Sequence, residues 1–186
     1  MHGMQLNLIG NNMAEFNSCA HLMETPEHKA AQEKYNELLA AGVDPFGYIM
    51  KMQETLQEQL AETFPNRCMK PSELKTLGQK YDWIRDNKIA FDDEYSELIS
   101  ALGGMNKSDK DRSALWKKWK SNHEAIRNEL FDDLTAEEKI ELMFECVDQV
   151  HFFLNQVVAL EMSAKDIFVL YYAKNAENAR RYKSGY

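Results

Sequence analysis

Apolar side chains recur every three or four positions through most of the chain, a period typical of amphipathic helices that share one core. No strongly β-rich run interrupts this pattern. Helices are predicted over residues 14–23, 26–41, 45–63 and 72–83, over a segment between a break at 86–88 and the glycines at 103–104, over a charged segment that begins at Ser108 and carries LWKKWK, and over residues 135–161 and 163–181.

Several predicted helices carry recognisable start and stop residues. Asp44 followed by Pro45 is a favourable N-cap and first-turn pair, and Gly42 is placed to end the preceding helix. Two further pairs have the spacing of a capping box, Thr135 with Glu138 and Ser163 with Asp166. The expected fold is therefore all-α, a single helical bundle.

Composition narrows the class of protein. The 186 residues allow one domain, expected over residues 13–186, with residues 1–12 as a loose N-terminal extension. The formal net charge of -8 argues against binding duplex nucleic acid. No apolar run approaches the length of a membrane span. Three cysteines without paired spacing favour reduced thiols and a cytoplasmic location.

Two acidic pairs at helical spacing are the main chemical signal. Glu94 and Glu97 lie three apart, as do Glu145 and Asp148, so each pair shares one helix face. The second pair lies in a strongly apolar stretch, where a buried carboxylate must be neutralised or given a cation. Four carboxylates on facing helices could hold a divalent metal, and a metal beside a polyphosphate would indicate phosphoryl chemistry.

Other interpretations of these acids stay open. Either pair could simply face solvent, and acids near the start of a helix are favoured by its dipole. His151 follows Asp148 by three residues, which is half of the pattern of a di-iron carboxylate bundle. A helical protein without catalytic activity, acting only as an interaction module, is a third possibility.

A polar row near the C-terminus suits phosphate oxygens. Lys174, Asn178 and Arg181 share one helical face, with lysine as a point charge and arginine as a fork. The alternative is a basic helix end favoured by the dipole. Gln53 and Gln57 share another face, and their amides could contact the edge of a base.

Several segments, taken together, resemble the all-α dUTPase and dCTP pyrophosphatase family, and its members from T-even-type phages in particular. The segments are FNSCAHL, MQETLQ, DDEYSELISALG, ALWKKWK, FECVDQVHFFLN and IFVLYYAKNAENARRYKSGY. Their order and spacing agree with the family from about Met13 to Tyr186. The resemblance implies the helical bundle of the dimeric dUTPase-like pyrophosphohydrolases.

The resemblance also implies roles for individual residues. It implies that Mg²⁺ is held by four carboxylates, those of Glu94, Glu97, Glu145 and Asp148. It implies that the triphosphate is held by Lys174, Asn178, Arg181 and Tyr186. It implies that the nucleoside lies near Gln53, Gln57, Trp83, His151, Phe152 and Asn155. The dimeric dUTPases generally carry asparagine at the position of Gln57, so strict selection of uracil is not expected.

The reaction implied by the resemblance is Mg²⁺-dependent hydrolysis of dCTP and dUTP to the monophosphate and pyrophosphate. Glu97 is the carboxylate expected to orient or deprotonate the attacking water. In a phage this would clear both nucleotides from the DNA precursor pool in the host cytoplasm. A homodimer is expected, and a wider nucleotide-synthesis complex is a possible partner.

Overall fold

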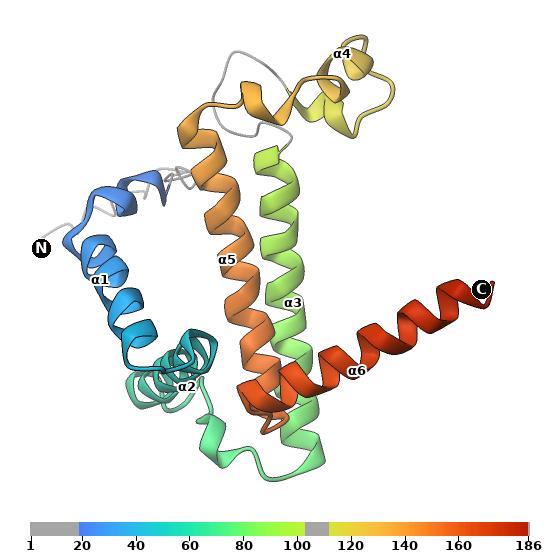
Figure 1. Ribbon diagram of the computed structural model, residues 1–186. Helices are drawn as coiled ribbons and strands as arrows, with labels where there is room; N and C mark the ends of the chain where they lie inside the picture. Colours follow the sequence, from blue (N-terminus) through green and yellow to red (C-terminus); the bar gives the residue numbers. More distant parts are fainter. Residues whose placement is uncertain (1–18, 103–111, 186) are drawn as a thin grey trace, which may run out of the picture.

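The computed structural model describes residues 19–102 and 112–185, which form α-helices and 3-10 turns (Figure 1). The α-helices are α1 (Pro26–Ala40), α2 (Pro45–Thr63), α3 (Leu77–Leu102), α4 (His123–Arg127), α5 (Ala136–Ala159) and α6 (Ala164–Lys183). The 3-10 turns are η1 (Cys19–Glu24), η2 (Pro71–Glu73), η3 (Arg112–Leu115) and η4 (Phe131–Asp133). No strand occurs in these residues, so the all-α prediction is confirmed.

Two long helices, α3 and α5, form the centre of the molecule and run antiparallel along most of their length (Figure 1). The capping box at Thr135 and Glu138 is present and fixes where α5 begins. Helix α2 packs against α5, and α1 connects α2 to η1, which returns to α5. The α3–α5 pair therefore provides the rigid surface on which side chains from distant parts of the sequence can meet.

The hydrophobic core is small and lies where α2, α5 and the start of α6 meet. Met50, Leu154 and Val157 are buried there, with Met162 and Ile167 packed against them. Many large apolar side chains elsewhere are exposed, above all along α6, which has no buried residue. Figure 1 shows α6 leaving the body near the end of α5 and projecting away from it.

Several sequence-based boundaries are confirmed. Helices α1 and α2 follow the predicted limits closely, and Gly42 takes the left-handed conformation (φ 66°) just after α1. Asp44 caps α2 by accepting from the amides of Phe46 and Gly47. The second capping box, at Ser163 and Asp166, starts α6.

Other boundaries were wrong. The break expected at residues 86–88 does not exist, because α3 is continuous and those polar residues include neither glycine nor proline. Ser72 lies in η2 and does not cap α3, whose first turn follows Thr76. Leu115 ends η3 and the rest of the segment LWKKWK forms turns, so no long charged helix forms there. Cys19–Glu24 is a 3-10 turn where an α-helix was expected, and the rest of that predicted helix lies outside the described residues.

Candidate functional site

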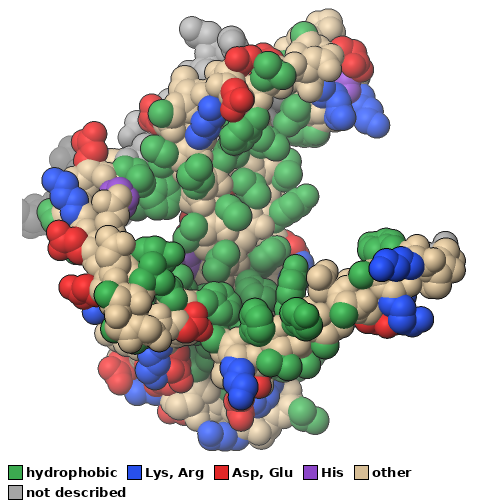
Figure 2. All heavy atoms as spheres, viewed as in Figure 1, with side chains coloured by type: hydrophobic (Ala, Val, Ile, Leu, Met, Phe, Trp, Pro, Cys, Tyr) green, Lys and Arg blue, Asp and Glu red, His purple; other side chains and the backbone are tan. Residues whose placement is uncertain are grey.

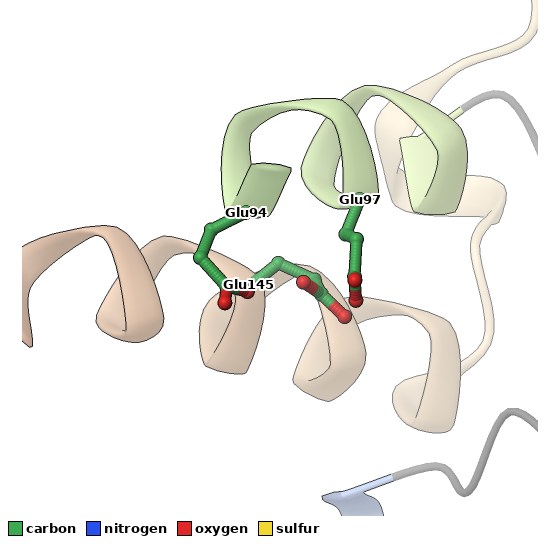
Figure 3. A group of neighbouring side chains, drawn as sticks. All are labelled: Glu94, Glu97 and Glu145. Atoms are coloured by element: carbon green, nitrogen blue, oxygen red, sulfur yellow. The ribbon is translucent and has the colours of Figure 1, made fainter. Parts of the chain in front are cut away.

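Three of the four predicted carboxylates meet between α3 and α5. Glu94, Glu97 and Glu145 each place one carboxylate oxygen within 4.8 Å of the others. Figure 3 shows Glu94 and Glu97 descending from α3 toward Glu145 on α5. The three-residue spacing on α3 aims both side chains at the same point, and the antiparallel packing of the helices brings Glu145 to it.

Glu145 is the most constrained member of this acidic cluster. The residue is only 6% exposed, and its Oε2 atom is buried without a hydrogen-bond partner. Burial, and after it the charges of Glu97 and Glu141, together raise the pKa of Glu145 to about 7. A buried carboxylate with an unsatisfied oxygen among like charges is a position that a cation would stabilise.

Asp148 borders the cluster without joining the closest group. Burial raises its pKa, while nearby His151 opposes the rise. Its charge in turn contributes to the raised pKa of Glu94, where desolvation is the larger cause. Asp148 therefore lies within electrostatic reach of the three glutamates and of the next group of polar residues.

Glu141 also belongs to this environment, although no role was predicted for it. It is 3% exposed on α5, and its charge raises the pKa values of Glu145 and Asp148. Its spacing was a usable signal, because it lies one helical turn before Glu145 on the same stripe.

The donor set suits a hard divalent cation such as Mg²⁺. All of its donor atoms are carboxylate oxygens, the ligands that Mg²⁺ and Ca²⁺ prefer. The unsatisfied Oε2 atom of Glu145 is the structural observation that favours an ion over a merely acidic surface. The residues that the structure places here therefore fit the predicted metal.

A second polar group crosses from α2 to α5 and α3. The Gln53 amide donates to Asn155 Oδ1 (2.7 Å), and the Asn155 amide donates to Asn87 Oδ1 (2.7 Å). His151 Nδ1 lies 2.6 Å from Gln53 Oε1, and Trp83 donates its indole N–H to the main-chain carbonyl oxygen of Asn155. Four residues predicted to surround the nucleoside are thus brought together, and Asn87 joins them unpredicted.

This amide chain is mostly internal. Gln53 and Asn155 are buried, whereas His151 is exposed and lines a groove together with Met52, Leu56 and Val147. Gln57 and Phe152 are half-buried and take no part in the hydrogen bonds given above. Val147 and His151 both line the groove, and Asp148 lies between them in the sequence of α5.

The predicted phosphate-binding residues lie on the projecting helix. Lys174, Asn178 and Arg181 occupy α6, and Arg181 Nε donates to Glu177 at 2.9 Å. Within this one chain only the start of α6 packs against α2 and α5, and the rest of the helix projects away from the α3–α5 pair (Figure 1). Tyr186 lies outside the described residues. One copy of the chain therefore does not bring these side chains to the carboxylates.

No helix in the described residues is both long and apolar enough to cross a membrane. Neither the scanned family models nor the solved structures gave a match.

Curated proteins do match. The chain is 41% identical over 174 residues to the dCTP pyrophosphatase of Enterobacteria phage LZ5, which covers 94% of this chain and all of that protein. Identity and coverage are the same for the dCTP pyrophosphatase of Enterobacteria phage T4. A longer DNA replication protein of phage T4 is 41% identical over 163 residues, which make up 88% of this chain and 41% of that protein. With this identity along the full length of two relatives, the chain belongs to the dCTP pyrophosphatase family of T-even-type phages.

Proposed function

We propose that this protein hydrolyses dCTP and dUTP to the nucleoside monophosphate and pyrophosphate, with Mg²⁺ as its cofactor. The relatives' shared name supports the reaction and dCTP as a substrate. The resemblance described above supports dUTP. The single structural observation that carries the proposal is the buried, unpartnered carboxylate oxygen of Glu145 facing two glutamates.

Some residues of the chain would hold the metal ion, and one would act on the attacking water. Glu94, Glu97 and Glu145 would hold the ion, and Asp148, whose charge acts on Glu94, is the fourth proposed ligand. When bound, Mg²⁺ supplies positive charge at the phosphate oxygens and makes water more acidic. Glu97 projects from α3 into the cluster, and we assign it the orientation of the attacking water or the removal of its proton.

The nucleoside would lie in the groove lined by His151, beside the acidic cluster. Its triphosphate then extends toward the carboxylates. Lys174, Asn178 and Arg181 would stabilise the negative charge of the departing pyrophosphate, with Arg181 exchanging Glu177 for phosphate.

We also propose that the active form is a homodimer. Phe168, Tyr171 and Tyr172 on α6 are each at least 70% exposed, which is a large apolar surface for one face of a helix. Figure 2 shows hydrophobic side chains gathered over the hollow beside α6. A second copy would cover this surface and could bring α6 of one copy to the carboxylates of the other.

A direct test of the metal site measures pyrophosphate release from a panel of nucleoside triphosphates, with Mg²⁺ or with EDTA. Wild type should release pyrophosphate from dCTP and dUTP only with Mg²⁺. Glu145→Gln keeps the side chain's size but removes its charge, so turnover should fall by about a hundredfold or more. Mg²⁺ should also raise the melting temperature of wild type more than that of this variant.

The matched control is Glu137→Gln, the same chemical change at an exposed position in the first turn of α5. It should leave both turnover and the Mg²⁺-induced shift unchanged. Undiminished turnover in a folded Glu145→Gln protein would remove the proposed metal site.

A further inference from the structure

The amide chain between α3 and α5 has a fixed direction, set at one end by a backbone carbonyl. Asn87 donates its amide N–H to the Trp83 carbonyl oxygen at 2.9 Å. A carbonyl oxygen can only accept, so the nitrogen of the Asn87 amide must face it. The Asn87 oxygen therefore faces Asn155, and that contact requires the nitrogen of the Asn155 amide.

The same reasoning extends along the amide chain to His151. With its nitrogen used by Asn87, Asn155 presents its oxygen to the Gln53 nitrogen. Gln53 then presents its own oxygen to Nδ1 of His151 at 2.6 Å. Only a protonated Nδ1 can complete that bond, so the neutral ring carries its proton on Nδ1 and leaves Nε2 as an acceptor.

Burial makes this direction difficult to reverse. Gln53 is 3% exposed and Asn155 2%, so water cannot replace a lost partner at either amide. Turning one amide would set two donors or two acceptors against each other in a dry environment. His151 is the exposed end of the amide chain and lines the groove. Its Nε2 atom has no hydrogen-bond partner among the described residues.

We propose that Asn87 is a positioning residue that holds His151 in the Nδ1-protonated form, so that Nε2 accepts a hydrogen bond from the bound nucleotide. The ligand group must be a donor: the exocyclic amino group of cytosine or the 3′-hydroxyl of the deoxyribose. The assignment of the ring proton stands on the hydrogen bonds alone, whereas the ligand contact rests on the proposed function.

The proton position is measured by ¹⁵N–¹H correlation spectra of the histidine rings. The spectra are taken at about pH 8.5, two units above the ordinary histidine pKa of about 6.5. His151 is assigned by the loss of its signals in His151→Gln. Wild type should show a protonated Nδ1 and a bare Nε2. A proton on Nε2 in wild type would overturn the proposal, with no variant needed.

Asn87→Ala then tests the anchor. Without the Asn87 oxygen, the Asn155 amide can turn, and the His151 signals should shift toward a mixture of both ring forms. Asn87→Asp retains an oxygen that accepts from Asn155 and should keep the wild-type form. His123 is an internal control, because its Nδ1 lies 2.6 Å from the Ala114 carbonyl and cannot respond to residue 87. An unchanged His151 in Asn87→Ala would overturn the role of Asn87.

Turnover of dCTP, dUTP and 2′,3′-dideoxy-CTP by wild type and Asn87→Ala identifies the donor. If it is the amino group, kcat/KM should fall about fivefold for both cytidine substrates and not for dUTP, the scale of one hydrogen bond. If it is the hydroxyl, the fall should occur for dCTP and dUTP and be absent for the dideoxy substrate. An unchanged kcat/KM in Asn87→Ala, relative to wild type, for all three substrates would overturn the ligand contact. Failure of wild type to hydrolyse any of them would instead overturn the proposed function, while the ring spectra would still decide the role of Asn87.

Discussion

Glu145 makes the stability of the metal-free protein depend on pH. Its pKa is about 7 in the folded chain, against 4.5 for an ordinary glutamate. Between these values the unfolded chain has released the proton that the folded chain still holds, so the free energy of unfolding falls as pH rises. The contribution is fully present below about pH 4.5 and lost by about pH 7, and it amounts to roughly 3 kcal/mol at 1.36 kcal/mol per unit.

We therefore expect Glu145→Gln to be more stable than wild type at pH 8 in EDTA, and to lose that advantage at pH 5. The neutral amide avoids the cost of a buried charge beside Glu94 and Glu97. Thermal melts at the two pH values measure the difference. Glu137→Gln removes a carboxylate that the helix dipole favours, so its difference from wild type should be small and the same at both pH values. A higher stability of wild type than of Glu145→Gln at pH 8 without metal would contradict the cost assigned to the buried charge of Glu145.

Individual residues differ in how far the sequence could identify them. Three of the four acids predicted from spacing do converge, because helical periodicity fixes which side chains share a face. Asn87 could not be found in this way. It lies in a run of polar residues that resembles a loop, and its role depends on a carbonyl of its own helix and an amide from α5.

At the scale of elements, a capping box fixes the start of α5, the helix that carries Glu145. Thr135 accepts from the Glu138 amide, and the Glu138 carboxylate accepts from the Thr135 amide. Thr135→Ala should lower the free energy of unfolding by about 1 kcal/mol, measured by urea denaturation. Thr135→Ser retains the hydroxyl and should lose much less. Equal losses in the two variants would show that the methyl group, not the cap, stabilises this end.

Helix limits were predictable where local chemistry decides them. The caps at Asp44, Thr135 and Ser163 are short-range signals, and all three helices begin there. The continuity of α3 was not predictable, since its polar middle is stabilised by packing on α5. The LWKKWK segment has a helical composition, yet it adopts turns with Trp116 and Trp119 in an edge-to-face contact.

At the scale of the whole molecule, the separation between α6 and the carboxylates leads to a test with mixed proteins. Glu145→Gln has a defective cluster and an intact α6, and a Lys174→Ala/Arg181→Ala variant has the reverse. If α6 serves the partner's cluster, a re-equilibrated equal mixture should recover about a quarter of wild-type activity, since half of the dimers are mixed and each has one complete site.

The same mixture distinguishes the alternatives. If α6 folds back onto its own cluster, no activity should return in the mixture. Light scattering of wild type should give the mass of two chains, and Phe168→Ser/Tyr172→Ser should shift the protein toward one, because both rings lie exposed and stacked on α6. A wild-type mass of one chain at micromolar concentration would contradict the dimer.

The two helices that supply the glutamates are separated in sequence by everything from residue 103 to residue 135 (Figure 1). Neither helix alone gathers all three side chains, so ion capture must await the docking of α3 on α5 during refolding. Luminescence from a lanthanide in place of Mg²⁺ should therefore develop later than the far-ultraviolet helix signal. The delay between the two signals would measure the time that α3 and α5 need to dock after their helices have formed.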